Sequence, residues 1–412
     1  MKTVILRLGG FVGFPLLGIL TPLLLLPVIA RVAGPTGWAS IVSAIAIGSF
    51  GATAILWGWN IRGTVLVAST TSSARRAELY GQSLVIRSSL AVVVVPVVIA
   101  LTAVIAAPEL RWQAAAVAGA TAVSGLSPAW FCVGIGSPRL MGVFDTLPRV
   151  ASAVIAIPLV ASTQNISYYP GLLLALTCAA LVVFQRTYFR RDVPARPTVR
   201  GSFNEWRRQV GSAGVNISGS AYSSVPVPIA TFRGPEAAAS VYSSADQLYR
   251  FGLFTTVALG NTFQGWTLEV HGAAQVRRHR AAMLSHLVLG LVGAVILWVF
   301  GPLASSILFG VDVAATPEAC LLYGLAFLFI NLGTPLIRNL LIPAGRDVFV
   351  LLSTITSAIV GIALMVLRSD AGNLTGIAVG VAASEAILFA AVLPAALRSL
   401  RRLKQSPEER AA

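Results

Sequence analysis

Residues 88–106 read SSLAVVVVPVVIALTAVIA, a run of nineteen residues without a charged side chain. A helix that crosses a lipid bilayer needs about 20 mostly apolar residues. The run lies in a predicted span, 84–106, and stretches of similar length and composition recur along the whole chain. This pattern predicts an all-α polytopic membrane protein.

We predict twelve transmembrane helices, in two halves of six. They cover residues 8–30, 38–59, 84–106, 113–133, 143–162, 168–185, 209–232, 241–268, 283–309, 317–342, 348–367 and 373–397. Composition agrees, because 56% of the 412 residues are hydrophobic and only 11% are charged, against about 25% in soluble domains. This excludes a soluble enzyme or a secreted domain.

The net charge of +15 does not indicate nucleic-acid binding, because the arginines form short clusters between apolar runs. Basic residues concentrate on the cytoplasmic side of membrane proteins. With the N-terminus inside, the twelve spans place 25 Lys and Arg residues inside and five outside. We therefore expect a multi-pass protein of the inner (plasma) membrane with both termini cytoplasmic.

Residues 29–43 and 229–243, which lie 200 positions apart, share seven identities, including the Gly-Pro of a turn between two spans. Their spacing indicates a duplication, and six helices per half make the two repeats parallel. The expected organisation is a six-helix bundle at 1–185, a basic cytoplasmic linker at 186–208, a second bundle at 209–397 and a basic cytoplasmic tail at 398–412.

Four short motifs resemble the multidrug/oligosaccharidyl-lipid/polysaccharide exporter superfamily, and specifically its bacterial oligosaccharide flippases. They are GPTGW at 34–38, GPEAA at 234–238, PAWFCVG at 128–134 and GWNIR at 58–62. The resemblance implies a flippase that moves an undecaprenyl-diphosphate-linked oligosaccharide to the outer leaflet by alternating access. It implies no cofactor, and it leaves open a polysaccharide polymerase as a partner in the same membrane.

Arginines within or near the spans are the candidate substrate-binding residues. Their guanidinium groups are able to bind phosphate oxygens through paired hydrogen bonds, although each is equally suited to anchor a helix end at a lipid headgroup. The candidates are Arg31, Arg62, Arg250 and Arg338, together with Trp57, whose ring suits stacking on a sugar or a place in an interfacial belt.

Two acids lie at membrane depth. Asp246 is four residues before Arg250, so the two side chains share a helix face and neutralise one another. Glu385 has no basic residue within one turn. It is a candidate for a coupling proton, or else a protonated residue hydrogen-bonded to a neighbouring helix.

Other classes find less support. No metal site is expected, because His271, His279 and His286 belong to an arginine-rich stretch that we interpret as a solvated loop, and the three cysteines have no paired spacing. An embedded glycosyltransferase or polymerase would need a larger external loop and suitably spaced carboxylates. A small-molecule exporter of the same superfamily remains the alternative.

Overall fold

The computed structural model describes residues 21–189, 199–270, 272–370 and 373–404. In these ranges the chain is helical apart from short connections and one isolated bridge between Asp370 and Asn373. It divides into two compact units, Met1–Phe232 and Arg233–Ala412, called here the N-terminal and C-terminal units.

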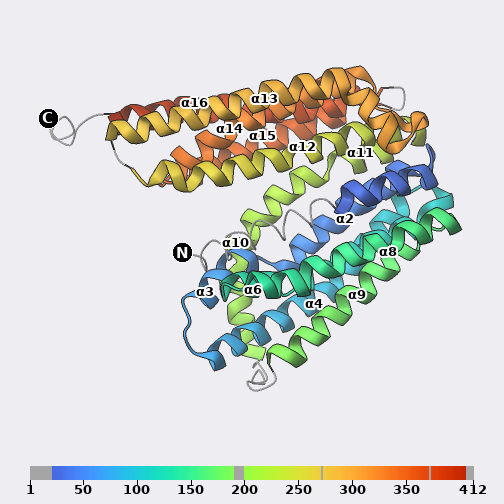
Figure 1. The fold of residues 1–412 in the computed structure, drawn as a ribbon, viewed down its shortest axis with the longest axis horizontal. Coiled ribbons are helices and arrows are strands. Elements are labelled where there is room, and N and C mark those ends of the chain that lie inside the picture. The colour runs from blue at the N-terminus through green and yellow to red at the C-terminus, as the bar shows by residue number, and fades with distance from the viewer. Residues whose placement is uncertain (1–20, 190–198, 271, 371–372, 405–412) are drawn as a thin grey trace. The chain divides into compact units, whose positions relative to one another are not determined.

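The N-terminal unit is a bundle of long helices interrupted by short breaks (Figure 1). After a helix at Thr21–Ala33, its α-helices are α2 (Trp38–Leu56), α3 (Thr64–Ala68), α4 (Ser73–Ile105), α5 (Arg111–Val123), α6 (Ala129–Gly134), α7 (Pro138–Met141), α8 (Leu147–Thr163), α9 (Tyr168–Tyr188), α10 (Val199–Ser224) and α11 (Pro226–Arg233). Two π-helical turns, η1 (Trp59–Gly63) and η4 (Gly142–Thr146), and a 3-10 turn, η3 (Ser124–Leu126), join some of them.

Small residues let the central helices of this unit approach closely. Helix α2 packs against α5 and α4, and a Cβ built on Gly48 would lie 2.6 Å from the carbonyl oxygen of Ala118. Aromatic rings fill the opposite end, where Trp59, Tyr80 and Trp130 are almost fully buried. This aromatic core fixes the segments around η1 and α6, which carry the candidate site.

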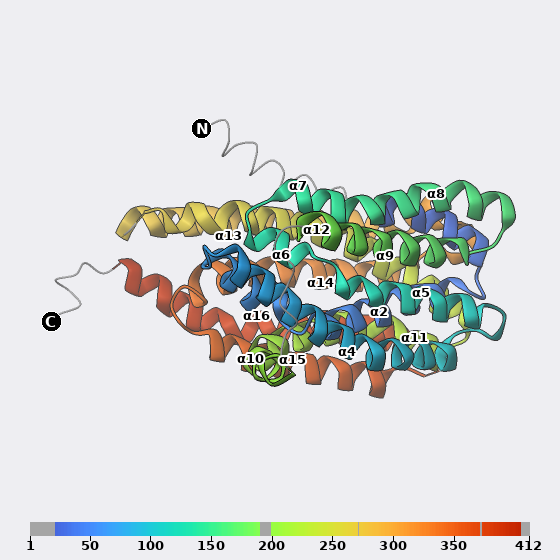
Figure 2. The ribbon, with the colours of Figure 1, turned by 90° about the horizontal axis from the view of Figure 1, so that it is seen from below.

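The C-terminal unit consists of α12 (Glu236–Leu268), α13 (Gly272–Phe309), α14 (Pro317–Pro335), the π-helical turn η6 (Leu336–Leu341), α15 (Asp347–Arg368) and α16 (Thr375–Lys404). Helix α14 packs against α13, α16 and α12, and α15 packs against α16. Figure 2 shows α13 and α16 from a second direction.

Nine of the described helices, counting α-helices together with the turns that continue them, are long and apolar enough to cross a membrane. They are Trp38–Leu56, Ser73–Ile105, Pro108–Gly134, Pro138–Thr163, Tyr168–Tyr188, Gly272–Phe309, Pro317–Leu341, Asp347–Arg368 and Thr375–Leu403. Each matches one of the twelve predicted spans.

The other three spans remain predictions. Most of 8–30 lies outside the described residues, and the helix at Thr21–Ala33 is short. Range 209–232 contains the end of α10 and all of α11, which are separate helices. Range 241–268 is helical throughout within α12, but polar side chains such as Asp246, Arg250 and Gln264 lower its hydropathy.

Candidate functional site

A cavity of about 420 Å³ lies inside the N-terminal unit, between α2, η1 and the segment that joins α5 to α6. Hydroxyl and amide groups alternate with apolar groups on its wall, and Arg149 at the start of α8 is its one charged lining residue among those described. The lining residues are Ser49, Ala52, Thr53, Leu56, Asn60, Thr64, Ser124, Gly125, Ser127, Ala129, Trp130, Val133 and Arg149.

Helix α10 supports the cavity from outside. The Ser220 hydroxyl donates to Thr53 Oγ1 over 3.2 Å, and the Asn216 side chain donates to Asn60 Oδ1. Both acceptors belong to lining residues. A segment that begins inside the predicted linker 186–208 therefore holds two polar groups of the cavity wall in place.

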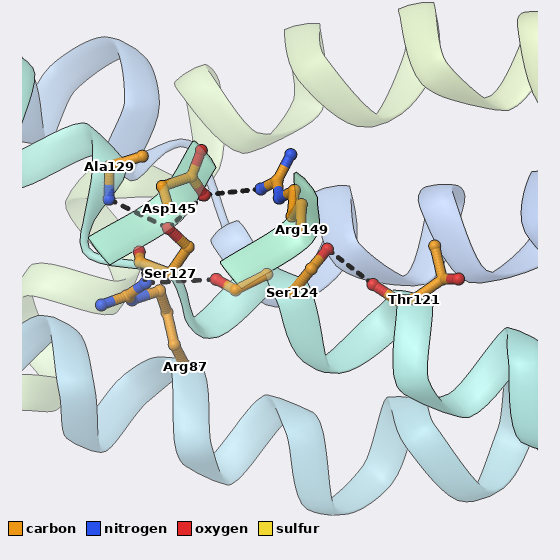
Figure 3. Close-up of polar contacts among 8 residues, drawn as sticks. Arg87, Thr121, Ser124, Ser127, Ala129, Asp145 and Arg149 are labelled. Carbon is orange, nitrogen blue, oxygen red and sulfur yellow. Dashed lines mark hydrogen bonds and ion pairs between the residues drawn. The ribbon is translucent and has the colours of Figure 1, made fainter. Parts of the chain in front are cut away.

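The guanidinium of Arg149 is held at the cavity by Asp145, one turn earlier. Arg149 Nη2 donates to Asp145 Oδ1 over 2.6 Å, and the Ser127 hydroxyl donates to the same oxygen over 2.6 Å (Figure 3). The Arg149 side chain is 44% exposed, whereas that of Asp145 is 14% exposed. The cation therefore faces the cavity and its partner lies behind it.

Arg87 is a buried cation behind the same wall. It is 0% exposed, and its Nη1 donates to the carbonyl oxygens of Gly125 and Ser127 over 3.1 and 2.9 Å (Figure 3). These carbonyls end the helical segment formed by α5 and η3, where a cation is favourable. Its guanidinium also lies 5.7 Å from the centre of the Trp130 ring.

Sequence reasoning assigned Arg87 to the cytoplasmic charges and missed this role. The available signal was its position three residues inside the predicted span 84–106. An arginine within a span almost always faces the bundle interior and pairs with backbone carbonyls or acids.

Trp57 and Arg62, two of the predicted site residues, lie together at the end of α2 and both contact α10. The Trp57 ring stacks on Trp206 with ring centres 5.4 Å apart, and its Nε1 donates to the Trp206 carbonyl oxygen over 3.2 Å. Arg62 Nε lies 3.4 Å from an oxygen of Glu205. The sequence gave no sign of these partners, because about 140 residues separate them from Trp57 and Arg62.

Gly58 makes the contact with α10 possible. It has a φ of +77°, and a Cβ at this position would lie 2.7 Å from the backbone nitrogen of Ala213. We expect Gly58→Ala to destabilise the protein by about 2–4 kcal/mol, from backbone strain and displacement of α10. Thermal unfolding in detergent measures this, with Gly211→Ala on α10, where nothing lies within 4 Å, as the control that keeps its stability.

Asp246 and Arg250 form the predicted pair in the C-terminal unit. The Arg250 side chain donates to Asp246 Oδ2, and the Tyr323 hydroxyl donates to Asp246 Oδ1 over 3.0 Å. Tyr323 also hydrogen-bonds to Tyr242. Asp246 is 2% exposed, so this cluster is a buried polar centre between α12 and α14.

The remaining predicted residues lie apart from these clusters. Arg338 in η6 donates from Nη2 to the side-chain oxygens of Asn261 and Gln264 on α12, over 2.8 Å each. Arg31 is exposed near the end of the first described helix. Glu385 is 8% exposed within α16, and no residue of the described chain is seen to form a hydrogen bond or ion pair with its carboxyl group.

The interpretation of the histidines as part of a solvated loop is wrong for two of them. Helix α13 begins at Gly272, so His279 and His286 lie within it and are buried. His286 packs against α14, where its Nδ1 lies 3.4 Å from Asn331 Oδ1. The helix continues through the arginine-rich stretch because its apolar and histidine faces pack inward, while His271 lies outside the described residues.

No protein-family description matches this sequence, and no curated protein matches it. Solved structures do. The inward-facing structure of a multidrug resistance MATE family transporter of the MOP superfamily has a TM-score of 0.65 at 15% identity, covering 94% of this chain and 96% of that chain. The lipid II flippase MurJ, in an inward closed conformation, has a TM-score of 0.66 at 12% identity, covering 97% and 90%.

The MATE transporter VcmN of Vibrio cholerae also matches, with a TM-score of 0.58 at 13% identity, covering 97% of this chain and 98% of that chain. All three similar structures are transporters of one superfamily, and none is an enzyme. The chain therefore has the fold of a multi-pass membrane transporter of the MOP type, which agrees with the superfamily that its motifs resemble.

Proposed function

We propose that this protein flips an undecaprenyl-diphosphate-linked oligosaccharide from the inner to the outer leaflet of the plasma membrane, by alternating access, for cell-surface polysaccharide synthesis. The observation that carries the proposal is the cavity of the N-terminal unit. Among the described residues, its wall holds one arginine, several hydroxyl and amide groups and no acid.

This chemistry suits a sugar that carries an anionic link to lipid. Hydroxyl and amide groups exchange hydrogen bonds with sugar hydroxyls, and a guanidinium binds phosphate oxygens through charge-assisted hydrogen bonds. Arginine stays charged in a medium of low dielectric constant, so its attraction for a diphosphate persists at membrane depth.

The second candidate is export of a small molecule, favoured by the TM-score of 0.65 to a multidrug transporter. The wall argues against a cationic drug, because a cation would meet Arg149 with no lining acid to neutralise it. The fold likeness alone fits both candidates, since the lipid II flippase has an almost equal TM-score of 0.66.

The remaining predicted residues have proposed roles along the same path. Arg31, Arg62, Arg250 and Arg338 would contact the diphosphate in other states of the transporter, and Trp57 would stack on a sugar ring. Glu385 or Asp246 would carry a coupling proton. Arg62 would have to leave Glu205 to do so, which makes the pair a candidate latch between α2 and α10.

Deletion of the protein is expected to cause lipid-linked oligosaccharide to accumulate on the inner leaflet, and wild-type protein is expected to clear it. Arg149→Ala should reduce clearance at least tenfold at equal expression, because it removes the cation of the cavity. Arg139→Ala is the matched control, since Arg139 is exposed and lies ten residues earlier. If deletion leaves the lipid-linked pool unchanged, the flippase proposal is wrong and the exporter is favoured.

A further inference from the structure

Asp145 is the acid nearest to the cavity in the hydrogen-bond network, yet it does not line the cavity. A single oxygen, Oδ1, accepts hydrogen bonds from both Arg149 and Ser127. Arg149 makes one side-chain hydrogen bond with the described residues, and a guanidinium has five N–H donors. Most of its donors are therefore available to a ligand.

The network around Asp145 carries a surplus positive charge. It links Arg87, through the Ser127 carbonyl and hydroxyl, to Asp145 and then to Arg149. Two cations and one acid leave a net charge of +1. Because Arg87 is fully buried and Arg149 is partly exposed, a ligand meets this surplus at Arg149.

We infer that Arg149 is the contacting group of an anion subsite for the diphosphate, and that Asp145 is its positioning residue, which also sets its affinity. This inference rests on the proposed function. Asp145 and Ser127 hold the guanidinium at the cavity wall. The carboxylate also repels the incoming diphosphate, so the subsite binds it weakly enough to release it. A transport site needs both properties, because binding must allow exit as well as entry.

Binding by the purified full chain in detergent tests the inference, with undecaprenyl diphosphate as the probe and undecaprenol as the uncharged control. Asp145→Asn keeps an acceptor oxygen for Ser127 and Arg149 but removes the negative charge. It should bind undecaprenyl diphosphate about tenfold more tightly, and undecaprenol with unchanged affinity, since unit charges a few ångströms apart interact at this level. Loss of packing would instead weaken the binding of both probes.

The gain should depend on Arg149. Arg149→Ala alone should bind undecaprenyl diphosphate at least tenfold more weakly, and adding Asp145→Asn to it should restore nothing. In cells, Asp145→Asn should clear the lipid-linked pool more slowly than wild type, although it binds more tightly. Arg139→Ala should match wild type in both measurements. Weaker or unchanged diphosphate binding by Asp145→Asn, or a gain that persists in the double variant, overturns the inference.

The two proposals fail in different ways. If the binding pattern holds but deletion causes no accumulation of lipid-linked sugar, the anion subsite stands and the flippase proposal falls. If accumulation occurs but the binding pattern is absent, the flippase proposal stands and the subsite lies elsewhere.

Discussion

Arg87→Met is expected to destabilise the N-terminal unit by about 3 kcal/mol. Methionine fills a similar volume, but it leaves the carbonyl oxygens of Gly125 and Ser127 without a donor inside the membrane. Each buried, unpaired carbonyl costs about 1–3 kcal/mol. The loss of a cation at the end of the α5 and η3 segment adds to this cost.

Thermal unfolding in detergent, followed by tryptophan fluorescence, measures the effect. Arg87→Lys keeps the charge but not the forked donor, so it should lose less stability than Arg87→Met. Arg139→Met, at an exposed position, should unfold at the wild-type temperature. An Arg87→Met variant as stable as wild type would mean that the two carbonyls find other partners, and that Arg87 does not hold the turn.

The sequence predicts the positions of nine long apolar helices well, because each consists of about 20 apolar residues between polar ends. Breaks within helices are harder to predict. The span 113–133 is in fact α5, a 3-10 turn and α6, and the carbonyls freed at that break are the ones that Arg87 binds. Such a partnership joins residues about 40 positions apart and leaves no periodic signal.

The candidate site shows the same limit. Arg62 and Trp57 stand out in the sequence as polar or aromatic residues at a helix end, but their partners Glu205 and Trp206 belong to a stretch that composition assigns to a linker. Asp145 and Arg149 are recognisable as a pair four residues apart. Only the fold shows that the arginine of this pair faces a cavity while its acid lies behind.

Asp246→Leu is expected to destabilise the C-terminal unit by about 3 kcal/mol. Asp246 is 2% exposed and accepts hydrogen bonds from Arg250 and Tyr323, so its removal leaves a partly buried cation and a buried hydroxyl without an acceptor. Breaking a buried ion pair from one side is costly, whereas replacing both partners by apolar residues is often nearly neutral. Asp246→Leu combined with Arg250→Met should therefore unfold at a higher temperature than Asp246→Leu alone.

The double variant also separates two roles of Arg250. If Arg250 contacts the diphosphate during transport, as we propose, the double variant is stable but clears lipid-linked oligosaccharide at least tenfold more slowly than wild type. Recovery of clearance together with stability would mean that Arg250 serves only to neutralise Asp246. Because Arg250→Ala alone leaves Asp246 buried without its cation, a loss of transport in that single variant would not distinguish the roles, and the comparison at equal stability is what decides between them.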